Sequence, residues 1–187
     1  NRRIHPIAGD VGTDGLGLDD AGRAMLATSD IVIHSAATVS FDSALDDAVE
    51  VNLLGPSRVA AGLRAAAKDR TEPTMGGLQP GDCAHLVAVS TCYVAGSRRG
   101  KAPEQLVNES PFFVDVDWRA EVINSHQARK DAEQASRTPE RLVLLSDEAV
   151  RALGAAGTPA IADRTEQLRQ KWVGQQMTDS GRARASS

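Results

Sequence analysis

The sequence predicts an α/β fold in which a small parallel β-sheet is flanked by helices. Two short apolar runs, residues 30–37 and 85–91, are rich in valine or isoleucine, as buried parallel strands are. Between them, residues 42–68 repeat alanine and leucine at helical spacing. The length of 187 residues, with 41% hydrophobic and 25% charged residues, fits one α/β domain of ordinary composition.

The composition excludes several classes of function. The formal net charge of −4, with acidic and basic residues interspersed, gives no basic surface for nucleic acid. No apolar stretch reaches the roughly 18 residues of a transmembrane segment, and no secretory signal opens the chain, so we expect a cytoplasmic location. Cys83 and Cys92 have no cysteine or histidine near them at metal-ligand spacing, so we expect neither a metal site nor a disulfide.

The N-terminal residues contain a glycine pattern that needs interpretation. Residues 4–9 are apolar but are interrupted by Pro6, which favours an edge strand. Residues 9–15 have a Gly-x-x-Gly-x-x-Gly spacing, a kind of loop that can hold a pyrophosphate. Four carboxylates would repel phosphate there: Asp10, Asp14, Asp19 and Asp20. We therefore predict a turn that leads into a helix over residues 19–27, with Asp19 as its N-cap.

The run at residues 30–37 ends in the small residues Ser35, Ala36 and Ala37. Small side chains at the carboxyl end of a strand allow a flat ligand or another backbone to come close. His34, which ends the apolar part, is predicted to be packed and hydrogen-bonded; the alternative is a ligand or an acid. Within the helix that follows, Pro56 predicts a kink or a helix that restarts after Gly55.

The run at residues 85–91 ends in two adjacent hydroxyl groups, those of Ser90 and Thr91. Ligands of open α/β sheets bind outside the carboxyl ends of the strands, so these hydroxyls lie where chemistry would take place. Because side chains alternate along a strand, only one of the two can point into the cleft. Further on, a basic cluster is predicted to be a solvated loop, with phosphate binding as the alternative: Arg98, Arg99 and Lys101.

The character of the chain changes after residue 114. Three segments, residues 117–135, 139–153 and 160–184, carry apolar residues in only one narrow stripe each, which predicts two or three helices. The tail from residue 181 has little to pack against and is expected to fray.

Three segments, in this order and at these spacings, carry a family resemblance. They are Gly9-Asp-Val11, then Ile33-His-Ser-Ala-Ala37 with Val51-Asn-Leu-Leu-Gly55, and Val89-Ser-Thr-Cys-Tyr-Val-Ala-Gly96. Together they resemble the extended short-chain dehydrogenase/reductase superfamily, and most closely its fatty acyl-CoA reductase branch, the male-sterility-type NAD-binding domains. The resemblance covers residues 4–112 and implies a partial Rossmann-type sheet that binds NADP or NAD, with NADPH favoured.

The resemblance also implies roles for individual residues. Asp10 would accept a hydrogen bond from the adenine amino group, with Val11 against the ring. The ribose and pyrophosphate side of the cofactor would be lined by Ser35, Ala36, Ala37 and Thr38. Asn52 would brace its helix against the sheet. Thr91 would be the catalytic hydroxyl that hydrogen-bonds the substrate carbonyl, with Ser90 as the alternative.

The sequence departs from the family pattern in two respects. No glycine-rich loop precedes Ile4, and no Tyr-x-x-x-Lys pair occurs in the chain. In that pair, the lysine lowers the pKa of the tyrosine, so that the phenol can protonate the new alkoxide. The only tyrosine, Tyr93, is followed four residues later by Ser97, and Lys130 is preceded by His126 where the tyrosine would stand.

The favoured interpretation is an internal piece of an NAD(P)H-dependent fatty acyl-CoA (thioester) reductase, inactive alone. Residues 1–114 would form a partial dinucleotide-binding core, and residues 115–187 a helical insertion or cap. Its substrate would be a fatty acyl thioester. Missing neighbour strands would expose an apolar sheet edge and favour self-association. The alternative is a non-catalytic α/β module that binds a nucleotide or a protein partner.

Overall fold

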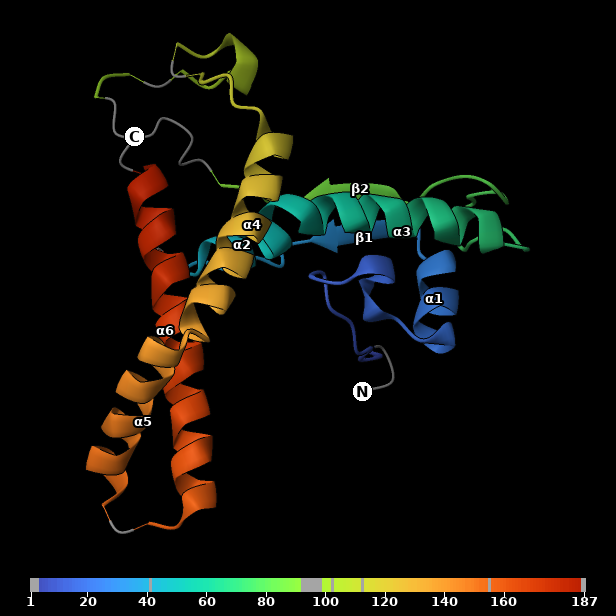
Figure 1. Ribbon diagram of the computed structural model, residues 1–187. Helices are drawn as coiled ribbons and strands as arrows, with labels where there is room; N and C mark the ends of the chain where they lie inside the picture. Colours follow the sequence, from blue (N-terminus) through green and yellow to red (C-terminus); the bar gives the residue numbers. More distant parts are fainter. Residues whose placement is uncertain are drawn as a thin grey trace. The chain divides into compact units, whose positions relative to one another are not determined.

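The computed structural model describes residues 4–40, 42–91, 99–101, 103–111, 113–154 and 156–185 (Figure 1). The chain forms two compact units, one of residues 1–37 and 53–118, the other of residues 38–52 and 119–187. The structure is mixed α/β and mostly helical, with one short parallel sheet, so the predicted fold class is confirmed.

The sheet of the first unit has two strands, β1 (Ile31–His34) and β2 (His85–Ala88). They pair in parallel, with Ile31 opposite His85 and His34 opposite Ala88. Two backbone bonds extend the pairing at its ends, from His85 N to Asp30 O at 2.9 Å and from Val89 N to His34 O at 2.8 Å. The predicted parallel pairing of the two apolar runs is therefore confirmed.

The edge strand expected at residues 4–9 is absent, so that prediction was wrong. Ile4 and Ile7 are exposed, and the segment has no regular secondary structure. Pro6 cannot donate to a ladder, and a strand also needs a partner to satisfy its remaining backbone groups. Residues 10–17 instead form a turn that ends in the 3₁₀ helix η1 (Asp14–Gly17), as the carboxylate-rich loop predicts.

The helices around the sheet begin where their local signals predict. Helix α1 (Asp20–Ala27) is capped by Asp19, whose side chain accepts a hydrogen bond from Gly22 N at 2.7 Å. The long segment that follows β1 comprises α2 (Leu45–Ala48), the π-helix η2 (Val49–Leu54) and α3 (Gly55–Asp69). Pro56 lies in the first turn of α3, where its missing N–H is tolerated, so the predicted restart is confirmed.

One face of the sheet is covered and the other is bare. Val32 and Leu86 pack against an apolar cluster made by η1, α3 and the residue before β2: Leu16, Val59, Leu63 and Ala84. The opposite face holds Ile31 and Ile33, which are 62% and 68% exposed, beside the exposed Val87. Parallel sheets are normally buried on both faces. Exposed apolar residues are thus present on one face of the sheet, while an exposed apolar edge and self-association stay predictions.

A buried arginine joins the loops below this sheet. Arg70 is 6% exposed, and its Nε donates to Ala27 O at 2.8 Å. Its two terminal nitrogens donate to the carbonyl oxygens of Ser29, Gln79 and Asp82. The surface loop predicted at residues 71–82 is also tied to β1 through Asp30, which accepts hydrogen bonds from Thr74 Oγ1 and from Gly76 N.

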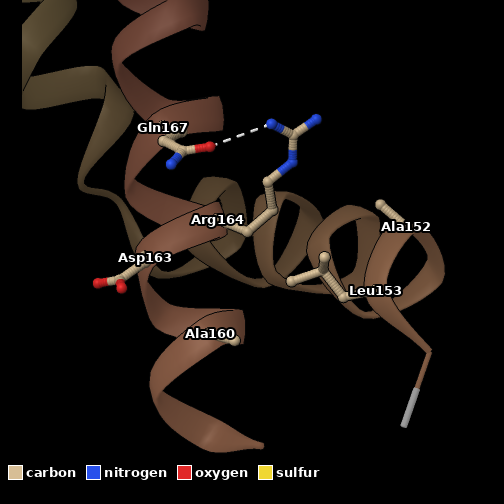
Figure 2. A pocket seen from close by; sticks show the side chains of 6 residues that line it. All are labelled: Ala152, Leu153, Ala160, Asp163, Arg164 and Gln167. Carbon is tan, nitrogen blue, oxygen red and sulfur yellow. Dashed lines mark hydrogen bonds between the residues drawn. The ribbon is translucent and has the colours of Figure 1, made fainter. Parts of the chain in front are cut away.

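The second unit contains the predicted C-terminal helices, α4 (Trp118–Ser136), α5 (Pro139–Leu153) and α6 (Thr158–Ala185). Helices α5 and α6 run side by side in opposite directions (Figure 1) and bury Leu145, Ala149 and Leu168 between them. Near their connection, Leu153 of α5 and Arg164 of α6 lie beside each other (Figure 2). Helix α4 packs on α6 through Ala132, Val173 and Met177.

Helix α6 continues through the residues expected to fray. Arg182 pairs with Asp42, and Arg184 pairs with Glu121 of α4. Gly181 lies against Leu45 of α2. The expectation of fraying was wrong because these partners are distant in the sequence and become neighbours only when the unit folds.

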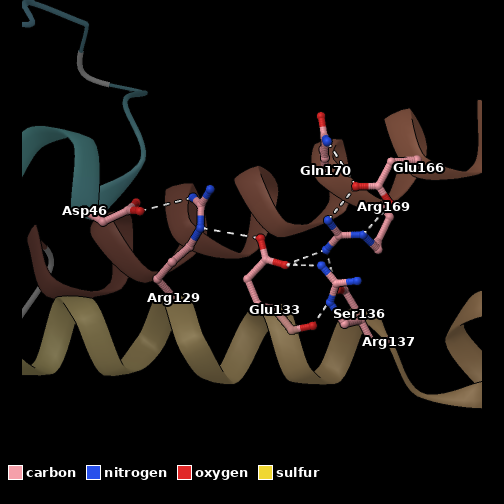
Figure 3. A network of polar contacts seen from close by, with 8 residues as sticks. All are labelled: Asp46, Arg129, Glu133, Ser136, Arg137, Glu166, Arg169 and Gln170. Atoms are coloured by element: carbon pink, nitrogen blue, oxygen red, sulfur yellow. Dashed lines mark hydrogen bonds and ion pairs between the residues drawn. The ribbon is translucent and has the colours of Figure 1, made fainter. Parts of the chain in front are cut away.

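A polar network at the α4–α6 contact is centred on Arg169, which is 4% exposed (Figure 3). Its guanidinium donates to Glu166 Oε2 at 2.8 Å, to Glu133 Oε2 at 2.6 Å and to Ser136 Oγ at 2.9 Å. These hydrogen bonds from Arg169, and one from Gln170, lower the pKa of Glu166 to about 2. Perturbed pKa values can mark functional sites. Here Arg169 forms ion pairs with Glu133 of α4 and with Glu166 of its own helix, and we interpret both as structural contacts.

We predict that Arg70→Leu destabilises the first unit by about 2–4 kcal/mol, because four carbonyl oxygens, including that of the buried Ala27, lose a charged donor. Amide hydrogen exchange of β1 and of residues 79–82 should accelerate together. Arg64→Leu is the matched control, since Arg64 is an exposed arginine of α3, the helix that ends directly before Arg70. Equal protection in the two variants would contradict the role assigned to Arg70.

We also predict an acid-dependent loss of stability in the second unit. Because the folded-state pKa of Glu166 lies below its ordinary value of 4.5, the ion pair stabilises the unit above that pH and is lost as the pH falls toward 2. The side chain of Glu166 is 48% exposed, so we expect a contribution of less than about 1 kcal/mol.

Urea unfolding monitored from pH 7 to pH 2 should show the difference in the free energy of unfolding between wild type and Glu166→Gln shrinking toward zero. Glu148→Gln, at an exposed carboxylate of α5, is the control. A difference that is constant with pH would refute the assignment.

Candidate functional site

The parallel pairing places two sets of candidate residues at one edge of the sheet. Because β1 and β2 run in the same direction and end opposite each other, Ser35, Ala36 and Ala37 leave the sheet at the same edge as Ser90 and Thr91. All five are exposed. His34, just before them, is 7% exposed, so it is packed as predicted. The edge therefore offers small side chains from one strand and hydroxyl groups from the other.

Asp10 and Val11 lie on the turn that precedes α1. Asp10 Oδ1 accepts a hydrogen bond from Gly12 N at 2.7 Å, and Asp10 N donates to Leu16 O at 2.8 Å. Leu16 reaches this position through a left-handed backbone with φ of 61°, between two glycines that also have positive φ. Val11 is partly buried and packs against the apolar cluster of Leu16, Val59, Leu63 and Ala84. The turn thus fixes the position of the Asp10 carboxylate.

Thr38 begins the part of the chain that belongs to the second unit. Asn52, on the π-helix η2, holds it with two hydrogen bonds: Thr38 N donates to Asn52 Oδ1 at 2.9 Å, and Asn52 Nδ2 donates to Thr38 O at 2.9 Å. The Thr38 hydroxyl also lies 2.9 Å from Ser43 Oγ. Asn52 therefore clamps the backbone directly after the small residues of the sheet edge.

Two shallow recesses lie in the second unit, away from the predicted site residues. The larger, of about 440 Å³, is bounded by α5 and α6 (Figure 2) and is lined by Ala152, Leu153, Ala160, Asp163, Arg164 and Gln167. In it, Arg164 Nη1 donates to Gln167 Oε1 at 3.1 Å. The smaller, of about 350 Å³, lies between α4 and α6 beside Trp172 and Met177. Neither is lined by a residue that the sequence analysis predicts for the site.

Two further features limit the chemistry that the described residues offer. In that part of the chain, no group of three or more His, Cys, Asp and Glu side chains is arranged to hold a metal ion. None of the helices described is both long and apolar enough to cross a bilayer. Tyr93 and the basic residue Arg98 lie outside the described residues. The sheet edge with Thr91 therefore remains the candidate site.

One set of residues was not singled out from the sequence. Asp42, Asp46 and Glu50 are spaced four residues apart. Asp42 and Asp46 form ion pairs with arginines of α6 and α4, and Glu50 lies within hydrogen-bond distance of His126 of α4. The regular spacing of the acids is visible in the sequence. Their basic partners are not, because they lie far along the chain: His126 is 76 residues from Glu50, and Arg182 is 140 residues from Asp42.

Comparison with known proteins agrees with the resemblance. The family model described as male sterility protein, an NAD-binding family, matches residues 1–167. Fatty acyl-CoA reductase 8 of Arabidopsis thaliana is 28% identical over 131 residues, which cover 66% of this chain and 24% of the relative. Fatty acyl-CoA reductase 1 of the same plant is 30% identical over 112 residues, 59% of this chain and 19% of the relative. No solved structure matches the chain.

A further plant relative, Probable fatty acyl-CoA reductase 5 of Arabidopsis thaliana, is 26% identical over 154 residues, 78% of this chain and 28% of the relative. The chain thus spans less than a third of the length of each of these relatives. The family model covers most of the chain, including all the segments that carry the resemblance. The chain belongs to the fatty acyl-CoA reductase (male sterility protein) branch of the extended short-chain dehydrogenase/reductase superfamily.

Proposed function

We propose that this chain supplies part of the dinucleotide-binding core of an NAD(P)H-dependent fatty acyl-CoA reductase, with NADPH as the preferred cofactor. The observation that carries the proposal is the sheet edge. There, the small residues after β1 and the hydroxyls after β2 emerge side by side from parallel strands, in a chain of an NAD-binding family. Ligands of parallel α/β sheets bind at this kind of edge.

The residues of the first unit are chemically suited to the adenosine part of such a cofactor. Asp10 Oδ1 accepts a hydrogen bond from Gly12 N. Oδ2, the second carboxylate oxygen, would accept a hydrogen bond from the adenine amino group, with Val11 beside the ring. The exposed Ser35, Ala36 and Ala37 have no large side chain that would keep a ribose or pyrophosphate away from the backbone. Thr38, held by Asn52, would continue this lining.

Thr91 is assigned to the substrate carbonyl, with Ser90 as the alternative. When bound, the nicotinamide supplies the hydride that reduces the acyl group. The hydroxyl of Thr91 would donate a hydrogen bond to the carbonyl oxygen and so stabilise the negative charge that develops there. Helices α4 to α6 would serve as an insertion or cap over the acyl or pantetheine part of the substrate.

A second candidate function is a non-catalytic α/β module that binds a nucleotide or a protein. The observation that favours it is the absence of a Tyr-x-x-x-Lys pair from the sequence. The two candidates differ in whether the complete protein turns over substrate.

We predict that Thr91→Val lowers kcat roughly 100-fold for acyl-CoA reduction in the complete reductase that, on this proposal, contains these residues. NADPH oxidation with a long-chain acyl-CoA is the measurement. Thr91→Ser keeps the hydroxyl and should retain most of the activity, and Ser90→Ala should change kcat less than about 3-fold. The reverse pattern would assign the carbonyl contact to Ser90. Unchanged kcat in both Thr91→Val and Ser90→Ala, or no reduction by the wild type, would refute the proposed role of this edge.

The polypeptide of 187 residues, purified alone, is expected to show no NAD(P)H-dependent reduction of acyl-CoA, because its sequence contains no Tyr-x-x-x-Lys pair to deliver the proton. The measurement is aldehyde and alcohol formation from a radiolabelled acyl-CoA. A boiled sample gives the background. Hydride transfer above that background would show that another group takes the place of the absent pair.

A further inference from the structure

Three acidic residues dock the segment of residues 38–52 onto the C-terminal helices. Asp46 Oδ2 lies 3.1 Å from Nη1 of Arg129, and Glu50 Oε1 lies 2.6 Å from Nε2 of His126. Arg129 and His126 are both on α4. Asp42 pairs with Arg182 of α6, and its backbone oxygen accepts a hydrogen bond from Thr178 Oγ1. Ala44 and Leu45 add apolar contacts with the cluster of Ala132, Val173 and Met177. The whole segment is thereby fixed to α4 and α6.

The exposed fractions of the side chains distinguish the Asp46–Arg129 ion pair from the Asp42–Arg182 ion pair. The Asp46 side chain is 13% exposed, whereas Asp42 and Arg182 are 70% and 57% exposed. Exposed pairs are screened by solvent and contribute little, while a buried carboxylate that loses its partner is costly. Asp46 Oδ1 is buried and has no hydrogen-bond partner among the described residues, so the Asp46 charge depends on Arg129 (Figure 3). The Asp46–Arg129 ion pair is therefore the polar contact that contributes most to holding α2 against α4.

The docked segment carries the group that holds Thr38. Asn52 lies on η2, immediately after α2, and η2 also contains Glu50. Its amide makes two hydrogen bonds to the backbone of Thr38, one in each direction. A side chain can keep such paired geometry only while its own backbone stays in place. The position of Thr38 is thus set by Asn52, and the position of Asn52 by the contacts of Asp46 and Glu50, which precede it on α2 and η2.

We propose that the Asp46–Arg129 pair is a positioning device for the Thr38 turn and so sets the affinity of the chain for its dinucleotide. The inference rests on the proposed function in one respect, namely that Thr38 lines the cofactor. Arg129 and Asp46 do not touch the cofactor themselves. They act through η2 and Asn52, and they make cofactor affinity depend on a helix that lies far along the chain from the sheet.

The test is a charge swap in the full chain. Asp46→Arg and Arg129→Asp each place like charges together, Asp46→Asn removes one charge with little change in size, and the double variant Asp46→Arg/Arg129→Asp restores an opposite pair. Asp47→Arg is the matched control, since Asp47 is an exposed aspartate adjacent to Asp46 on the same helix. Two quantities are measured: the amide exchange rate of Thr38 and the Kd for NADPH. Exchange at Val173 reports whether α6 still folds.

The expected result for each single variant is a Thr38 exchange rate and a Kd for NADPH that are both raised about 10-fold. Both should return to within about 3-fold of wild type in the double variant, and Asp47→Arg should change neither. If the amide of Val173 loses its protection from exchange in a reversed-charge variant, α6 no longer folds there. The Thr38 exchange rate and the Kd of Asp46→Asn then decide between the outcomes. The inference is overturned if Thr38 exchange is unchanged in the single variants, if Asp47→Arg has the same effect, or if the swap gives no rescue.

The two proposals fail in different ways. If Thr38 exchange follows the charge swap but the wild-type chain does not bind NADPH, the cofactor assignment is wrong, and the control of affinity falls with it. If the wild-type chain binds NADPH but neither Kd nor exchange responds to the swap, the proposed function stands and the positioning role is wrong.

Discussion

The parallel pairing of β1 with β2 is the constraint on which the candidate site depends. Paired residues of the two strands, such as Ile31 and His85, are 54 positions apart in the sequence. Residues of η1 and α3 pack against one face of the pair, through Val32 and Leu86. The register fixes which residues emerge together, and a shift of one strand by one residue would turn its partly buried apolar residue, Val32 or Leu86, toward solvent. The cost of exposing that apolar face therefore also aligns Ser35, Ala36 and Ala37 with the hydroxyls that follow β2.

The features that the sequence predicts correctly depend on short-range physics. Asp19 caps α1 through a bond to a residue three positions away, and Pro56 sets the start of α3 through its own missing donor. The apolar runs predict β1 and β2 because a strand buried on one face needs such residues wherever its partner lies. In each case the signal lies within a few neighbouring residues, so the element can be predicted without knowing its partners in the fold.

The features that the sequence does not predict depend on distant partners. Residues 4–9 have the apolar character of a strand but no neighbouring strand in the structure, and an unpaired backbone gains nothing from extension. The end of α6 has the composition of a frayed tail, yet Arg182 and Arg184 find acids far away in the sequence. The candidate site shares this limit. Small residues and hydroxyls at strand ends are predictable, whereas the two bonds that hold Thr38 become visible only in the structure.

The segment of residues 38–52 connects these two kinds of interaction. It follows β1 without a break in the chain, so its first residue continues the line of small side chains at the sheet edge. Yet its contacts are with α4 and α6, and its acids are paired with residues that come much later. A single covalent bond, between Ala37 and Thr38, therefore separates residues ordered by the sheet from residues ordered by the helices.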